Sequence, residues 1–111
     1  MTSADLSDRY FTSIRARDID GLMALYAEDA VFTLPDGREF SGAAAIREMH
    51  LSVFAAGAPI PTPVATVIGN GSIAVEIEAR LADGTARRTA NFYHLDAAGH
   101  IRRLRVYRQG K

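Results

Sequence analysis

Hydrophobic residues recur every three or four positions at the start of the chain. Leu6, Tyr10 and Ile14 lie four residues apart, and Phe11 follows the second of them. This spacing places the four side chains on one face of a helix of about three turns. Thr2, with an acid three residues later, is typical of an N-terminal capping box. The pattern therefore predicts a helix that begins near Thr2 and buries one face.

Two more helices are predicted in the first half of the chain. Asp18 is a typical N-cap, and the apolar residues after it predict a helix whose buried face reaches Tyr26. On this interpretation Glu28 and Asp29 form a polar helix end, and a catalytic role for them is the alternative. Ser41 is a suitable N-cap for a third helix. The buried face of that helix would comprise Ile46, Met49, His50 and Val53.

The second half of the chain shows the two-residue alternation of strands. In residues 72–81, SIAVEIEARL, apolar side chains alternate with charged ones, and Asp83-Gly84 is a strong hairpin signal. Three prolines make residues 58–63 a stiff extended connector. The predicted strands span residues 30–34, 64–68, 72–81, 85–95 and 100–108. Three helices and a strand meander predict an α+β fold with a mostly antiparallel sheet.

The strand predicted at 85–95 places an amide among apolar neighbours. Asn91, Tyr93 and Leu95 share one face of this strand, and Phe92 lies on the other. If Leu95 faces the helices, Asn91 is buried beneath them as well. A buried amide needs hydrogen-bond partners from the protein or from a ligand.

Composition limits the class of protein. The 111 residues fit one domain, residues 1–111, and equal numbers of acidic and basic residues provide no general attraction for nucleic acid or acidic lipid. The absence of cysteine excludes disulfides and thiolate sites. No run approaches the roughly 20 apolar residues of a membrane span, and the acidic start is unlike a signal peptide. We therefore expect a cytoplasmic protein.

Three segments carry a specific resemblance: DIDGLMALYAEDAVFTLPDG, FSGAAAIREMH and NFYHLDAAGHIRRLRVYRQ. With the element order, they resemble the SnoaL-like and ketosteroid-isomerase-like branch of the nuclear transport factor 2-like superfamily over nearly the whole chain. The resemblance implies a cone-shaped α+β barrel with a pocket between helices and curved sheet. It also implies a homodimer through the outer sheet face. Because this scaffold hosts isomerases, cyclases, hydrolases and binders, it does not specify an activity.

The resemblance also assigns roles to single residues. In ketosteroid isomerase a tyrosine on the first helix donates to the developing oxyanion, which implies this role for Tyr10. The second donor corresponds to Asn91, whose amide donates at every pH. The supporting aromatic residues correspond to Tyr26 and His50. The general base, an aspartate before the turn proline, corresponds to Leu34. Loss of a base typically costs ~10²- to 10⁴-fold in rate, so we do not expect true steroid isomerisation.

Other candidate residues leave alternatives open. His50 is either a catalytic base or a group that only orients Tyr26 or Tyr10. Arg108 either turns inward at the mouth, where it would bind a carboxylate or enolate, or points to water. The three histidines have no metal-ligand spacing, so we expect no metal. The pocket function that we expect includes no cofactor. The residues expected to contact the ligand are Tyr26, Leu34, Met49, Val53, Tyr93, Leu104, Val106 and Arg108.

Three functions follow from these expectations. The first is a cofactor-independent pocket protein for a small apolar molecule with a carbonyl or phenolic oxygen, acting, if it is an enzyme, as an isomerase or cyclase through an enolate. The second is a non-catalytic binding or assembly module, which the missing carboxylate favours. The third is a scaffold whose own side chains fill the cavity. An epoxide hydrolase of the limonene type is not expected, because the inward positions supply an arginine at best rather than two acids.

Overall fold

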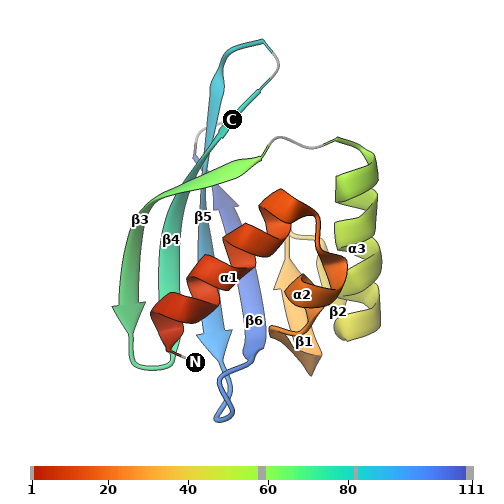
Figure 1. The fold of residues 1–111 in the computed structure, drawn as a ribbon, viewed down its shortest axis with the longest axis vertical. Helices are drawn as coiled ribbons and strands as arrows, with labels where there is room; N and C mark the ends of the chain where they lie inside the picture. Colours follow the sequence, from red (N-terminus) through yellow and green to blue (C-terminus); the bar gives the residue numbers. More distant parts are fainter. Residues whose placement is uncertain (1, 58–59, 82, 110–111) are drawn as a thin grey trace.

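Three helices pack against one face of a curved six-stranded sheet (Figure 1). The computed structural model describes residues 2–57, 60–81 and 83–109. The helices are α1 (Ser3–Ala16), α2 (Ile19–Met23) and α3 (Ala43–Ala55). The strands are β1 (Tyr26–Thr33), β2 (Glu39–Ser41), β3 (Pro61–Gly69), β4 (Ser72–Arg80), β5 (Ala86–Leu95) and β6 (Ile101–Arg108). This arrangement confirms the predicted α+β fold class.

The strand order in the sheet is β2-β1-β6-β5-β4-β3. β1 and β6 are parallel, and every other neighbouring pair is antiparallel. The early strand β1 therefore lies beside the last strand, β6, and extends the four-stranded meander that the sequence predicts. The β4–β5 hairpin projects beyond the helices (Figure 1). Residues near its tip therefore have no helical cover.

The first helix begins as its sequence predicts. The Thr2 hydroxyl accepts the Asp5 N–H at 3.1 Å, and the Asp5 carboxylate accepts the Thr2 N–H at 3.2 Å. This pair is the expected capping box. α1 ends at Ala16 and is capped by Arg17, whose φ of 53° is the only positive value among the described residues other than glycine. α1 then lies across the sheet, with α3 beyond it toward the β1–β2 edge (Figure 1).

The second helix is shorter than predicted, and this changes the position of two acids. α2 ends at Met23, and Tyr26 is the first residue of β1, paired with Ile101 of β6. Glu28 and Asp29 are therefore exposed residues of a strand, and their placement at a helix end was wrong. Pairing with the last strand overrides the local helical pattern, because propensity is weaker than tertiary context.

The predicted cap of the third helix was also wrong. Ser41 is the last residue of β2 and pairs with Val31, and Gly42 is the N-cap of α3. Gly42 has a φ of 91°, which explains the glycine, and its N–H donates to the Ala30 carbonyl at 2.7 Å. The sequence analysis did not predict β2, because its three residues are too few to show an alternation.

The proline-rich connector is partly a strand. Residues 61–63 begin β3, whereas residues 58 and 59 of the predicted connector lie outside the described residues. β3 is the last strand at one edge of the sheet. Prolines are tolerated at an edge because one side of such a strand has no ladder partner.

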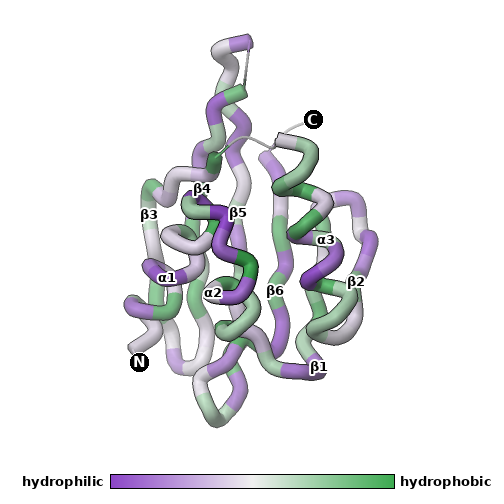
Figure 2. Tube along the Cα trace, turned by 45° about the vertical axis from the view of Figure 1, so that its right-hand side comes forward, coloured by the Kyte–Doolittle hydropathy of each residue, from purple (hydrophilic) through white to green (hydrophobic). Residues whose placement is uncertain are grey.

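Alternation along the strands separates an inner from an outer face. Purple and green segments alternate along β6 (Figure 2). On β5, Asn91 and Tyr93 are buried beneath the helices, as the parity of the sequence predicts, whereas Phe92 is 41% exposed. Tyr107 on β6 is 53% exposed and packs edge-on against Phe92, with ring centroids 5.5 Å apart. A homodimer through this outer face stays a prediction.

The core lies between the inner sheet face and the helices. It includes Leu6 and Phe11 of α1, Ile46 of α3, and Ile73 and Leu104 of the sheet, all at most 2% exposed. In the described part of the chain, no helix has both the length and the apolar character needed to cross a membrane. A cytoplasmic location stays a prediction.

Candidate functional site

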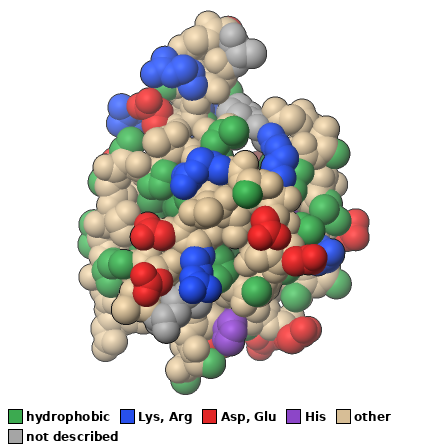
Figure 3. Space-filling model, viewed as in Figure 1, with side chains coloured by type: hydrophobic (Ala, Val, Ile, Leu, Met, Phe, Trp, Pro, Cys, Tyr) green, Lys and Arg blue, Asp and Glu red, His purple; other side chains and the backbone are tan. Residues whose placement is uncertain are grey.

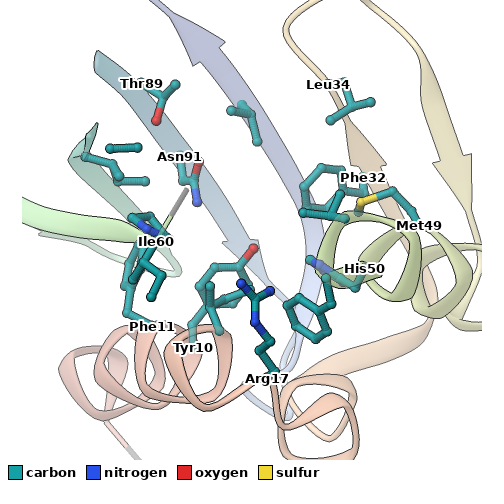
Figure 4. A pocket seen from close by; sticks show the side chains of 17 residues that line it. Tyr10, Phe11, Arg17, Phe32, Leu34, Met49, His50, Ile60, Thr89 and Asn91 are labelled. Atoms are coloured by element: carbon teal, nitrogen blue, oxygen red, sulfur yellow. The ribbon is translucent and has the colours of Figure 1, made fainter. Parts of the chain in front are cut away.

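A cavity of about 230 Å³ opens between α1, α3 and the inner face of the sheet. Seventeen side chains line it, and most of them are apolar (Figure 4). An apolar cavity of about 150 Å³ can hold benzene, so this one has room for a body of one or two rings. The cavity contradicts a scaffold filled by its own side chains. On the exterior, basic side chains flank a hollow above α1 (Figure 3).

The deep wall of the cavity contains Tyr10 and His50, and Tyr26 lies directly behind His50. The Tyr26 hydroxyl and His50 Nε2 form a buried hydrogen bond of 3.0 Å. The Tyr10 ring meets the His50 ring edge-on, with centroids 6.4 Å apart. α1 supplies Tyr10, β1 supplies Tyr26 and α3 supplies His50. Three separate elements thus bring these polar side chains together at the end of one apolar space.

Burial sets the charge of this wall. Burial raises the pKa of Tyr10 to about 12, and burial is also the main cause that raises the pKa of Tyr26 well above its ordinary value. Burial lowers the pKa of His50 to about 4. At neutral pH all three side chains are therefore uncharged. The tyrosines keep their protons and can donate hydrogen bonds, while His50 is neutral imidazole.

A second polar group reaches the cavity from β5. Asn91 Nδ2 donates to the Tyr93 hydroxyl at 3.0 Å, and Asn91 lines the cavity. Tyr93 lies behind it and packs edge-on against Tyr10, with centroids 5.2 Å apart. One amide N–H is thus used to hold Asn91 in place. Among the described residues, the other N–H and the carbonyl oxygen form no competing hydrogen bond and can bind a ligand.

The other predicted contact residues fall into three groups. Leu34, Met49, Val53 and Val106 line the cavity. Tyr26, Tyr93 and Leu104 are buried in the core and do not line it. Arg108 is exposed and lines two neighbouring grooves instead. It shares the face of Val106, but it lies at the end of β6, where the exposed side chain extends toward water rather than into the cavity.

The described lining residues include no aspartate or glutamate. Leu34, at the position that the resemblance implies for the general base, contributes an apolar side chain. Glu28 and Asp29 lie outside the lining. No group of three histidine, aspartate or glutamate side chains that could hold a metal forms in ranges 2–57, 60–81 and 83–109. The polar chemistry of the cavity therefore consists of neutral donors and one cation.

That cation, Arg17, was missed in the sequence analysis. It directly follows the last residue of α1, and its side chain points toward the same space as Tyr10 (Figure 4). Its guanidinium carbon lies 5.4 Å from the centroid of the Phe54 ring. The helical period does not extend to this left-handed residue, so the sequence pattern carried no signal for it. The remaining lining residues not named as contacts are Phe11, Ile14, Phe32, Phe54, Ile60, Pro61, Ile77, Ala79 and Thr89.

Fold and cavity together define a small α+β protein with a helix-covered pocket on a curved sheet. The family model described as SnoaL-like domain matches residues 7–105. The chain belongs to the SnoaL-like domain family.

Solved structures share this fold at low sequence identity. The epoxide hydrolase/cyclase-like enzyme SalBIII, which has a role in pyran ring formation in the polyether salinomycin, is 22% identical with a TM-score of 0.81, covering 95% of this chain and 88% of that one. A provisionally named ketosteroid isomerase from Kribbella flavida is 21% identical with a TM-score of 0.82, and the match covers 96% of this chain and 77% of that one. A provisionally named polyketide cyclase from Sinorhizobium meliloti is 22% identical with a TM-score of 0.80, covering 92% and 93%.

Proposed function

We propose that the cavity binds a small, largely apolar molecule with a carbonyl or phenolic oxygen and acts on it as an isomerase or cyclase through an enolate, with the neutral imidazole of His50 accepting the proton from the carbon next to the carbonyl. Tyr10 and Asn91 donate hydrogen bonds to that oxygen, and Tyr26 and His50 hold Tyr10 in place. One observation carries the proposal: an apolar cavity of about 230 Å³ has two neutral donors, Tyr10 and Asn91, in its wall. The SnoaL-like family and the cyclase and isomerase names of its structural neighbours support this reaction class.

Neutral donors in an apolar cavity suit an oxygen that gains negative charge. Removing one such donor from an enzyme typically costs ~10²- to 10³-fold in rate. Tyr10 can serve at any physiological pH, because its raised pKa keeps the phenol protonated. The donors supply this stabilisation from the protein itself, so the proposal includes no cofactor.

A non-catalytic binding function is the second candidate, and the state of His50 favours it. Forming an enolate requires a group that accepts the proton from the carbon next to the carbonyl. The Nε2 atom of His50 is already held by Tyr26, and the low pKa makes His50 a weak base. The hydrogen bond and the low pKa of His50 therefore favour a role in orienting Tyr26 over a role as a base. Binding without turnover needs only the donors and the apolar walls.

Thermal unfolding with added naphthol tests the donor role of Tyr10. We expect naphthol to raise the melting temperature of the wild type, because a ligand that binds only the folded state stabilises it. Tyr10→Phe should bind naphthol roughly three- to tenfold more weakly, which corresponds to one lost hydrogen bond. Tyr107→Phe changes an exposed residue that does not line the cavity and should bind like the wild type. Equal binding by wild type and Tyr10→Phe would contradict the donor role.

Proton exchange separates catalysis from binding. Acetonaphthone in heavy water exchanges its methyl protons when an enolate forms, and NMR follows their loss. The isomerase or cyclase proposal predicts faster exchange with the wild type than with Tyr10→Phe. Exchange at the rate of the buffer, despite measurable binding, would favour the binding function. A panel of other small ketones extends the test to different shapes.

A further inference from the structure

We propose that Arg17 forms a carboxylate-binding subsite at the mouth of the cavity, so that the natural ligand is an acid with an apolar body. This inference deepens the proposed function, on which it rests for the position of the ligand's neutral oxygen. The carboxylate would lie at Arg17 and the carbonyl or phenolic oxygen at Tyr10 and Asn91. Arg17 lies seven residues after Tyr10, which separates their backbones by about 10 Å along the axis of α1. A ligand of two fused rings with substituents at opposite ends spans that distance.

The backbone at Arg17 gives the first argument. The Asp18 N–H donates to the Ser13 carbonyl at 2.9 Å, and the Arg17 N–H donates to the Ile14 carbonyl at 3.1 Å. This is the Schellman motif that ends many helices, and glycine is the usual residue at its left-handed position. Arg17 occupies that position with a φ of 53°. A left-handed backbone costs arginine more free energy than glycine. The presence of arginine at this position therefore indicates a function for its side chain.

The side chain of Arg17 is placed for a ligand rather than for an ion pair. None of the ion pairs among the described residues includes it. The nearest acids in sequence have other partners: Asp18 accepts the Gly21 N–H at 3.0 Å, and Asp20 pairs with Arg47 at 3.1 Å. The Phe54 ring holds the guanidinium at the cavity edge. A stacked guanidinium keeps its forked donors available for a carboxylate.

The charge of the cavity gives the third argument. The low pKa of His50 keeps it neutral, so Arg17 carries the only charge among the described lining residues at neutral pH. A neighbouring groove shares Leu34, Thr89 and Val106 with the cavity, and it contains three more arginines and a single acid. Those arginines are Arg38, which pairs with Asp36 at 2.8 Å, Arg87 and Arg108. Positive charge in and beside the cavity attracts anions and disfavours cations.

Matched probes isolate the carboxylate. The 6-hydroxy-2-naphthoate isomer of hydroxynaphthoate carries a phenol and a carboxylate at opposite ends of its two rings, and 2-naphthol carries the phenol alone. Isothermal titration of wild type should show hydroxynaphthoate binding about 10- to 100-fold more tightly than naphthol, the gain typical of a charge-assisted hydrogen bond. In Arg17→Gly that preference should fall to about twofold or less, while the affinity for naphthol stays within about twofold of wild type. Arg17→Lys, which keeps the charge but loses the fork, should fall between them.

We do not expect Arg17→Gly to destabilise the fold. Glycine relieves the left-handed backbone, so its melting temperature without ligand should equal or exceed that of the wild type. Arg108→Ala is the matched control, because it removes an exposed arginine of the neighbouring groove and should change the affinity for hydroxynaphthoate by less than about threefold.

Each other outcome decides between the two proposals. Two results with Arg17→Gly would overturn the subsite: an unchanged preference for hydroxynaphthoate, or an equal loss of affinity for both ligands. Failure of millimolar hydroxynaphthoate to bind the wild type would overturn it as well. Binding of hydroxynaphthoate that depends on Arg17 but not on Tyr10 would keep the subsite and reject the donor role of the proposed function.

Discussion

The deep wall and the mouth of the same cavity are built differently. Tyr10, Tyr26, His50 and Asn91 in and behind the deep wall are each no more than 6% exposed and come from four elements. At the mouth, Val53 is 39% and Ile60 is 51% exposed, and Arg17 lies at the end of a helix. The deep wall is therefore part of the core, so its residues hold the fold together as well as any ligand. The residues at the mouth contribute little to core packing, so they can determine which ligand binds without a large effect on stability.

Truncation of a buried ring behind the deep wall should have the largest effect on stability. Tyr93 is 0% exposed, contacts Tyr10 and accepts the hydrogen bond of Asn91. Tyr93→Ala should lower the free energy of unfolding by about 3–5 kcal/mol, the usual cost of removing a large buried ring. Val53→Ala at the mouth should cost less than about 1 kcal/mol, because the side chain is already exposed. Urea unfolding of both variants measures the difference, and similar losses would contradict the comparison.

Acid should weaken the deep wall through His50. Its pKa is about 4 in the folded protein and about 6.5 in the unfolded chain. Between these values the unfolded state binds more protons, so the free energy of unfolding falls as the pH falls. From pH 7.5 to pH 5 the loss should be about 2 kcal/mol, mainly below pH 6.5. The mouth contributes no such loss, because arginine stays charged throughout this range.

Non-titrating variants identify the group responsible. His50→Gln should remove most of the acid-dependent loss between pH 7.5 and pH 5. His100→Gln replaces an exposed histidine beside a turn and should keep the wild-type dependence. Urea unfolding at several pH values gives both curves. A wild-type dependence that survives in His50→Gln would show that another group is responsible.

The same division explains how much the sequence reveals. Spacing along α1 and alternation along β5 identify Tyr10 and Asn91 as inward-facing, because burial imposes a period on both elements. The end of α2 and the strand β2 depend on pairing between distant segments, which leaves little local signal. Arg17 is hidden for another reason. Its inward direction follows from a left-handed backbone that sequence rules reserve for glycine, so a mouth residue was harder to predict than a core residue.

The smallest of the three effects concerns the hydrogen bond between Tyr26 and His50. Tyr26→Phe removes the hydroxyl and leaves the Nε2 atom of His50 without that partner. His50 lines the cavity, so water can reach it, and the expected loss is only about 1 kcal/mol. Tyr107→Phe on the exposed outer face should change the free energy of unfolding by less than about 0.5 kcal/mol. Because burial rather than this hydrogen bond lowers the pKa of His50, Tyr26→Phe should keep the loss of stability in acid. If that loss disappears with the hydroxyl, the hydrogen bond and not burial keeps His50 neutral, and the deep wall is held by polar contacts more than by its core packing.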